Sequence, residues 1–266
     1  MIKIVVCLKL VMDPEVPFSA FKIDRGAMKP VPPEGMPPVI NLFDENALEA
    51  ALKIKDEQDC KITVISVGRS LPKAILQKCL AVGADEVIAL EGPEFENLDP
   101  FTTADALASA IRKVGEYDLV FTGRQAADWD AGLVWAGIAE ALNLASITIA
   151  RKATVSGDKV TVERVASDGI EILEANLPAL INFSNEAGEL RQLSLRDLIK
   201  VKKQQIPKWS GGDIDFKNIN PMKMADFCIP DLGFVECRFI QGLNPEEKGR
   251  ALARELTKAG YILQAI

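Results

Sequence analysis

Histidine is absent from the 266 residues of this sequence, and that absence narrows the chemistry available to the chain. It excludes Ser-His-Asp and Cys-His triads, an imidazole general base and the commonest protein ligand for metals. Carboxylate and lysine chemistry is still allowed. The composition therefore favours binding or carriage of a cofactor, where the cofactor supplies the reactive chemistry.

Closely spaced cysteines are also missing. The chain has no C-x-x-C pair, and its five cysteines are Cys7, Cys60, Cys79, Cys228 and Cys237. Disulfide frameworks and structural zinc sites need closer spacing. We therefore expect reduced thiols and a cytoplasmic location.

No apolar run reaches the length that spans a bilayer. The apolar start of the chain is interrupted by Lys3, Lys9 and Asp13 and has no small-residue cleavage site, so we interpret it as a buried strand rather than a signal peptide. A net positive charge is absent as well: the net charge is -7 and the pI about 4.9. Only the stretch 200–203 is basic, which argues against a nucleic-acid partner.

Short apolar runs alternate with amphipathic segments over about the first 150 residues, which predicts a doubly wound, mostly parallel α/β sheet. The expected strands are 2–8, 61–67, 86–90, 118–122 and 146–150. The expected helices are 44–56, 70–82 with a Ser70 cap, 100–114 and 132–142. The proline-rich stretch after the first strand predicts a long loop or an edge ribbon.

The pattern changes after residue 150. Segments 153–155 and 160–165 flank Gly157-Asp158, a hairpin signal, and 169–175 and 178–183 read as further strands, so the sheet is expected to gain an antiparallel section. A short helix is expected at 195–201, a polar tail at 204–230 and a last helix at 245–259. We divide the chain into an adenine-nucleotide-binding, Rossmann-like domain, 1–203, and a C-terminal arm and helix, 204–266.

Ligands of open parallel sheets bind outside the carboxyl ends of the strands, where the strand order reverses. The longest loop at such an end is 123–132, GRQAADWDAG. Its small residues Ala131 and Gly132 precede a helix, and a helix N-terminus favours phosphate. Asp128 and Asp130 are candidates to cap that helix or to bind a ribose hydroxyl. An ordinary tight turn with an aspartate cap explains the same residues equally well, because neither G-x-G-x-x-G nor a P-loop is present.

Other polar residues have plainer interpretations. Asn41 and Asp44 are expected to cap the helix that follows them. Glu45 and Glu49 are expected on a solvated helix face, and Cys7 in the core as a small hydrophobe.

The succession IVVCLK, NLFDENALEAALKIKD, LAVGADEVIAL, DLVFTGRQAADWDAGLVWAGIAEAL, LPALINF and LRQLSLRDLIKVKK resembles the electron transfer flavoprotein β subunit over residues 1–206. The resemblance implies an α subunit as partner and an adenine-nucleotide pocket on the three loops at strand ends, 7–9, 66–68 and 123–132. The implied pocket residues are Cys7, Lys9, Asn41, Phe43, Asp44, Val67, Gly123, Arg124, Gln125, Ala126, Asp128, Asp130, Ala131, Gly132, Leu133 and Val134.

The resemblance also implies a docking segment, in which the family's leucine matches Leu195 and the lysines behind it match Lys200, Lys202 and Lys203. The family usually has hydroxyl or amide residues where this chain has Ala131, Gly132 and Leu133, so phosphate binding here must depend on backbone N–H groups. The tail is expected to pack on the α subunit.

The form of the loop resembles the electron-bifurcating branch of anaerobic metabolism, which implies FAD in the pocket, NADH as a transient substrate, and ferredoxin or flavodoxin as an acceptor. The implied third partner is a flavin dehydrogenase of the acyl-CoA or 2-hydroxy-acid type. Three alternatives stay open: a respiratory-type subunit holding AMP, a stand-alone adenine-nucleotide-binding module, and a structural β subunit with an empty pocket. No catalytic residue and no metal ligand is expected.

Overall fold

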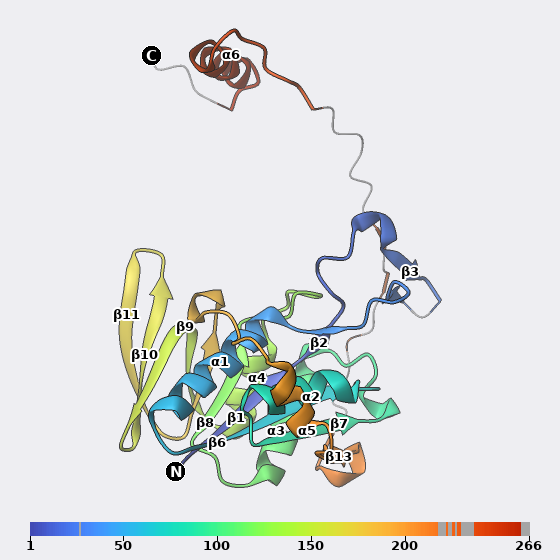
Figure 1. Cartoon of the computed structure of the whole chain (residues 1–266), viewed down its shortest axis with the longest axis vertical. Helices are drawn as coiled ribbons and strands as arrows, with labels where there is room; N and C mark the ends of the chain where they lie inside the picture. Colours follow the sequence, from blue (N-terminus) through green and yellow to red (C-terminus); the bar gives the residue numbers. More distant parts are fainter. Residues whose placement is uncertain (27, 218–221, 223–224, 227, 230–236, 262–266) are drawn as a thin grey trace. The chain divides into compact units, whose positions relative to one another are not determined.

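A mostly parallel central sheet organises the chain. The structure is a computed structural model that describes residues 1–26, 28–217, 222, 225–226, 228–229 and 237–261. Nine strands pair in the order β11-β10-β9-β12-β8-β1-β6-β7-β13 (Figure 1). Parallel pairing joins β1 (Ile2–Leu8), β6 (Cys60–Gly68), β7 (Glu86–Glu91), β8 (Leu119–Gly123) and β12 (Ala179–Phe183), and it continues to β9 (Ala145–Ser156) at one end and β13 (Lys208–Trp209) at the other. The predicted α/β class is confirmed.

Helices cover both faces of this sheet, as a doubly wound fold requires. They are α1 (Leu42–Glu57), α2 (Lys73–Val82), α3 (Pro100–Val114), α4 (Val134–Leu142) and α5 (Leu195–Val201). Buried residues of α1, α2 and α5 belong to one core cluster, and those of α3 and α4 to a second. The helices α3 and α4 approach closely, because a Cβ on Gly137 would lie 2.6 Å from the Cβ of Ala104.

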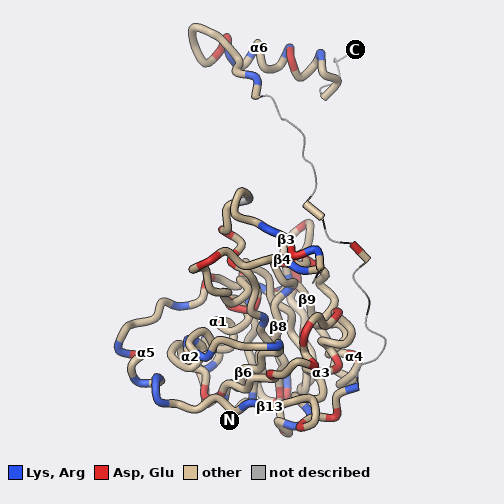
Figure 2. The backbone as a smooth tube through the Cα atoms, turned by 90° about the vertical axis from the view of Figure 1, so that its right-hand side faces the viewer, with Lys and Arg blue, Asp and Glu red and all other residues tan. Residues whose placement is uncertain are grey.

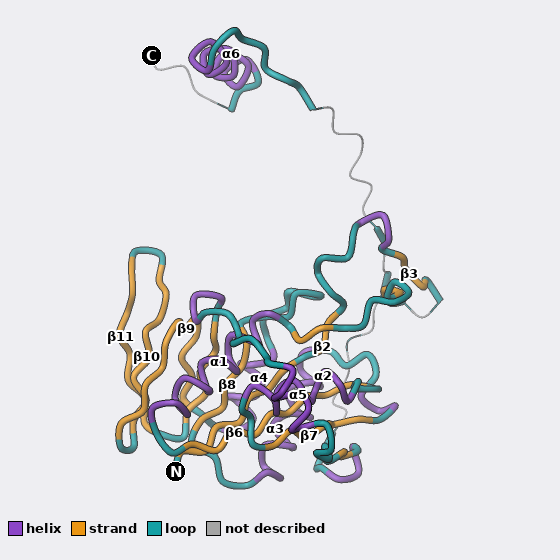
Figure 3. The backbone as a smooth tube through the Cα atoms, in the orientation of Figure 1, coloured by secondary structure: helices purple, strands orange, loops and turns teal. Residues whose placement is uncertain are grey.

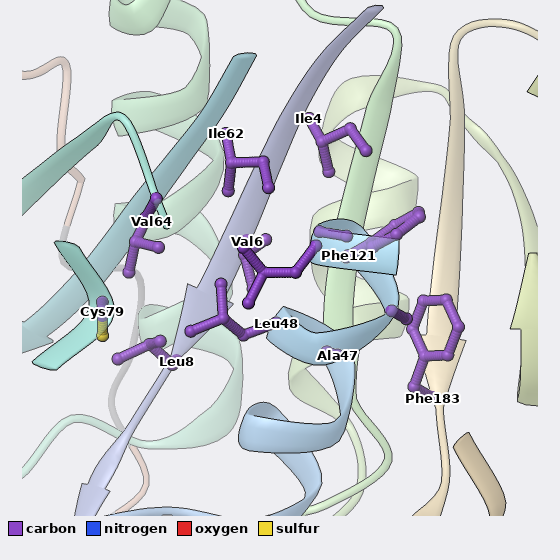
Figure 4. Packing of buried hydrophobic residues seen from close by; sticks show 14 of the residues in the cluster. Ile4, Val6, Leu8, Ala47, Leu48, Ile62, Val64, Cys79, Phe121 and Phe183 are labelled. Carbon is purple, nitrogen blue, oxygen red and sulfur yellow. The ribbon is translucent and has the colours of Figure 1, made fainter. Parts of the chain in front are cut away.

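Side-chain alternation along β1 divides the core between the two layers. Ile4, Val6 and Leu8 belong to the cluster that contains α1, and Val5 and Cys7 to the cluster that contains α3 and α4. Figure 4 shows the first of these layers, with β1 side chains meeting Leu48 of α1. A strand buried on both faces has to be apolar at nearly every position, which explains the continuous run that begins the sequence.

An antiparallel section extends one end of the sheet. It consists of β9 (Ala145–Ser156), β10 (Lys159–Ala166) and β11 (Gly169–Asn176), and the turn between β9 and β10 uses Gly157 at φ 62°. The hairpin β10–β11 extends beyond the neighbouring strands (Figures 1 and 3). Its last strand is the sheet edge and leaves Ile170 43% and Ile172 63% exposed.

The proline-rich excursion after β1 forms two small ribbons, as expected. Strand β2 (Leu10–Val11) pairs with β5 (Val39–Ile40), and β3 (Lys22–Asp24) pairs with β4 (Lys29–Val31). Four short 3₁₀ turns lie at Phe18–Ala20, Pro93–Phe95, Asn185–Ala187 and Gly211–Asp213.

The beginning of the expected polar tail is ordered against the sheet. Strand β13 (Lys208–Trp209) pairs with β7, and the Lys113 ammonium lies 4.4 Å from the centre of the Trp209 ring. Ile214 and Phe216 pack on the second core cluster. The polarity of 204–230 hid these apolar contacts from the sequence pattern. The part of that stretch at 218–221, 223–224, 227 and 230 lies outside the described residues.

The chain forms two compact units, 1–226 and 227–266. The second contains α6 (Pro245–Lys258), which begins after Asn244, whose side chain accepts a hydrogen bond from the Glu247 N–H. Among the described residues, no helix is long and apolar enough to cross a membrane.

Three expected helix starts are wrong, and the first is that of α1, which begins at Leu42 rather than at Asp44. Ser70 does not cap α2, which begins at Lys73 after Pro72, because a residue before proline is disfavoured in helical conformation. Helix α4 begins at Val134 rather than at Gly132, whose φ of 61° is left-handed. The fifth strand is also longer than expected, since β9 continues to Ser156 through a distortion at Ile149, where φ is 57°.

Candidate functional site

The strand order reverses beside β1. Strands β6 and β7 follow on one side of it, and β8 and β12 on the other. The carboxyl ends of β8, β1 and β6 are therefore neighbours, which brings together Gly123, Lys9 and Val67 as the sequence predicted. Val67 still belongs to β6 and packs partly on the second core cluster, so it lines the edge of this crevice rather than a loop.

Asn41 fastens the long loop after β8 to the start of α1. Its Nδ2 donates to the Gln125 carbonyl at 2.8 Å, and its Oδ1 accepts from the Ala127 N–H at 3.0 Å. The residue stands at the N-cap position of α1 but makes no side-chain cap there. The capping interpretation of Asn41 is wrong, because its amide is used across the crevice.

Asp44 joins the ends of two strands. Its Oδ2 accepts from the Lys9 N–H at 2.7 Å, directly after β1, and its Oδ1 accepts from the Gly123 N–H at 3.1 Å, at the end of β8. The side chain is buried, and this burial raises the pKa of Asp44 to about 7, although the two N–H donors, Asn41 and the Lys9 charge oppose the shift. Asp44 is thus a clamp between strands rather than a helix cap.

Asn182 completes the attachment of Gly123. Its Nδ2 donates to the Gly123 carbonyl at 2.8 Å and to the Thr122 hydroxyl at 3.2 Å. Sequence reasoning missed this residue. The available signal was an amide inside the apolar run PALINF, which is costly to bury unless it is hydrogen-bonded.

The two exposed loop aspartates form side-chain pairs at the end of these strands. The Lys9 ammonium lies 2.7 Å from Asp128 Oδ2, and the Gln125 amide donates to Asp130 Oδ1 at 2.9 Å. Neither aspartate caps α4, whose N-cap position is Leu133 without a side-chain cap. The capping interpretation of Asp128 and Asp130 is therefore wrong. The positive charge of Lys9 offsets the negative charge of Asp128, one of the two carboxylates in the loop.

The start of α4 carries unpaired backbone donors. In the part of the chain that the structure describes, the N–H groups of Ala131, Gly132, Leu133 and Val134 make no hydrogen bond. Leu133 is the N-cap and Val134 the first residue of α4, so their N–H groups belong to the helix N-terminus and its positive dipole end, whereas Ala131 and Gly132 are donors of the loop before it. The arrangement suits an anion that binds to backbone rather than to hydroxyl groups.

The remaining predicted residues surround these groups. Cys7 is buried on β1, and burial together with the Asp44 charge raises the pKa of its thiol well above the usual range, so it is a core residue. Phe43 and Ala126 are half-buried and Arg124 is exposed, beside the residues fixed by Asn41. The described residues contain no cluster of His, Cys, Asp or Glu suited to a metal ion.

The predicted docking residues lie apart from this crevice, on α5. Leu195 is 75% and Ile199 64% exposed, one turn apart on the same face. Basic residues follow along the helix and the turn after it (Figure 2), where Lys200 pairs with Asp197 and both Lys202 and Lys203 are exposed. This is an exposed apolar strip with a positive border.

Glu49 does not lie on a solvated face. It is buried, and its Oε1 lies 3.0 Å from the Arg191 guanidinium, which also lies 2.7 Å from Asp56. The partner arrives from a position 142 residues away, so local spacing could not reveal it. The contact fixes the segment that leads into α5.

Comparisons with known proteins agree on one family. A model of the electron transfer flavoprotein domain matches residues 34–210. The electron transfer flavoprotein subunit beta of Clostridium acetobutylicum is 36% identical over 219 residues, 82% of each chain. Protein FixA of Azorhizobium caulinodans is 34% identical over 82% of this chain and 78% of its own. The caffeyl-CoA reductase-Etf complex subunit CarD of Acetobacterium woodii is 36% identical over 80% and 79%.

Proposed function

This chain belongs to the electron transfer flavoprotein β-subunit family, and from that membership we propose that its crevice holds FAD and that its α-subunit complex transfers electrons by bifurcation. The observation that supports the proposal is the loop 123–133. Side chains of Asn41, Asp44 and Asn182 fix its first half, and the unpaired N–H groups of Ala131, Gly132 and Leu133 end it, followed by that of Val134 at the start of α4.

The donor set fits a pyrophosphate. Backbone N–H groups of Ala131 to Val134 supply hydrogen bonds without hydroxyl side chains, and Lys9 and Arg124 supply positive charge. Lys9 already offsets the Asp128 carboxylate, which otherwise would repel a phosphate. These residues bind and orient the nucleotide. When bound, FAD supplies hydride and one-electron chemistry, and no acid or base from the chain is required.

We propose NADH as the transient reductant and ferredoxin or flavodoxin as one acceptor, with the α-subunit flavin as the other. The C-terminal arm and helix, 204–266, are proposed to pack on the α subunit. A reducing cytoplasm suits a chain whose cysteines Cys7, Cys60 and Cys79 are buried thiols.

The partner dehydrogenase is proposed to dock on α5. Leu195 and Ile199 offer the apolar contact and the lysines offer attraction to an acidic rim. The name of the CarD relative places that protein in a complex with a CoA-ester reductase, which supports an acyl-CoA type of partner over a 2-hydroxy-acid type. Leu195→Ala is expected to weaken electron transfer to the dehydrogenase, and Ile172→Ala, similarly exposed on β11, is the matched control.

The deciding experiment counts nucleotides. The chain is purified with its α subunit, the complex is denatured, and FAD and AMP are measured per heterodimer. Two FAD and no AMP are expected. One FAD and one AMP would make this chain the respiratory type and refute both FAD binding and bifurcation here. A chain without any nucleotide would be a structural subunit.

A further inference from the structure

The Asp44 carboxylate connects the end of β1 to the end of β8, where the proposed nucleotide loop begins. Asp44 accepts hydrogen bonds from Lys9, after β1, and from Gly123, the last residue of β8. Both of its oxygens are therefore already engaged by backbone, and the side chain is only 7% exposed. Asp44 therefore supports the start of the loop through backbone hydrogen bonds and does not contact the ligand itself.

Gly123 is packed so closely that no larger side chain fits at this position. A Cβ at this position would lie 2.3 Å from Asp44 Oδ1 and 2.6 Å from the Phe43 carbonyl carbon. The Gly123 carbonyl accepts from Asn182, so the backbone N–H and C=O of Gly123 are both bound to buried side chains. Residues 124–133 follow directly, and their placement depends on this anchor.

We propose that Asp44 is a positioning residue for the nucleotide: as a carboxylate it locks the ends of β1 and β8 together, and loss of its charge loosens the loop that receives the phosphates. The inference rests on the proposed nucleotide site and adds a proton-linked control of its affinity. Protonation removes the negative charge and turns one carboxylate oxygen into an O–H group, so the charge-assisted hydrogen bonds from the Lys9 and Gly123 N–H groups become weaker.

The groups that face Asp44 identify it as the one that changes charge near neutrality. From β1, the Cys7 thiol stays protonated because burial and the Asp44 charge raise its pKa. After β1, the Lys9 ammonium favours the charged carboxylate. From α1, Asn41 is uncharged, and β8 offers only the Gly123 N–H. Burial raises the pKa of Asp44 to about 7.

Affinity for FAD is measured on the full 266-residue chain by fluorescence quenching from pH 6 to 8.5 at constant ionic strength. With a pKa of about 7, the competent carboxylate fraction falls about tenfold between pH 8 and pH 6, and the apparent Kd rises by about the same factor. Asp44→Asn is expected to bind weakly at every pH and to lose this dependence. Asp118→Asn is the matched control, because Asp118 accepts from the Lys3 N–H and ties the opposite ends of the same two strands.

An unchanged Kd, or a Kd that falls towards pH 6, would overturn the role of Asp44, as would a wild-type slope in Asp44→Asn. If that variant does not fold, amide exchange of the wild-type chain replaces it. Protection of the Gly123 N–H, corrected for the intrinsic rate, must then decrease from pH 8 to pH 6, and constant protection would refute the clamp. A wild-type chain that binds neither FAD nor AMP at any pH refutes the proposed function itself, which distinguishes the two failures.

Discussion

Gly123→Ala tests how tightly the end of β8 meets the start of α1. The new Cβ would lie 2.3 Å from Asp44 Oδ1, 2.6 Å from the Phe43 carbonyl carbon and 2.7 Å from the Asp44 nitrogen. Two of these atoms belong to the backbone of α1, so relief requires a shift of the helix or of the strand. Such overpacking costs about 1–3 kcal/mol, and loss of the charged hydrogen bond adds about 1.5–3 kcal/mol. We expect the free energy of unfolding to fall by about 3–5 kcal/mol.

Urea unfolding followed by circular dichroism measures this loss. Gly212→Ala is the control, because its nearest neighbour would be Ser210 Oγ at 3.7 Å, an ordinary contact. The control is expected to unfold within about 0.5 kcal/mol of wild type. A Gly123→Ala protein as stable as the control would show that the strand end and the helix are not in close contact, and would contradict the positioning role assigned to Asp44.

Four further changes are expected. Asn182→Leu leaves the Gly123 carbonyl unpaired and lowers stability by about 1–3 kcal/mol in urea unfolding; no loss would contradict its structural role. Arg191→Met leaves the buried Glu49 without its cation and costs about 1–3 kcal/mol by the same assay, since the pair is only partly buried; Arg250→Met, which removes an exposed pair, is the control. Because the folded pKa of Asp44 is raised to about 7, wild-type stability rises relative to Asp44→Asn as pH falls from 7.5 to 5.5, by about 1–2 kcal/mol, and an opposite trend would contradict the shift. Burial raises the pKa of the Cys60 thiol to about 11 and that of the Cys79 thiol to about 12. In the native chain a thiol reagent is therefore expected to modify the exposed Cys228 and Cys237 quickly. The buried Cys7, Cys60 and Cys79 are expected to react only after denaturation.

Stability and binding respond to the Asp44 proton in opposite directions. Protonation removes a buried charge and favours folding, whereas the proposed clamp needs the charge. A residue with a merely structural role would shift unfolding without changing the pH profile of FAD binding.

The helices and strands could be predicted from the sequence wherever buried residues recur at a regular spacing. Strand β1 is apolar on both faces and α3 has an apolar stripe between Asp99 and Gly115, so both were predicted with nearly correct ends. Helix α4 was begun two residues early because small residues suit a helix start, whereas the positive φ of Gly132 is set by the loop. Strand β13 was missed because two residues give no period.

Only part of the candidate site could be predicted from the sequence, because most of its contacts are not local. Ligands of open parallel sheets bind at the carboxyl ends of the strands, which pointed to the loop after Gly123, and the family resemblance added Lys9. The partners of Asn41, Asp44 and Asn182 are not local: the bonds from these side chains cross 35 to 86 residues of sequence. A local pattern assigns such residues to caps, and only the folded chain shows that they hold a loop.

The two edge strands of the central sheet differ in length and exposure, and this difference affects how the purified protein associates with itself. One end is closed by the two-residue strand β13, and the other by the eight-residue strand β11, with Ile170 and Ile172 exposed. A long exposed edge strand is a template on which strands of other molecules add. Self-association of the isolated subunit should therefore begin at β11, and a lysine at position 172 is the first change to make when the chain is produced without its partner.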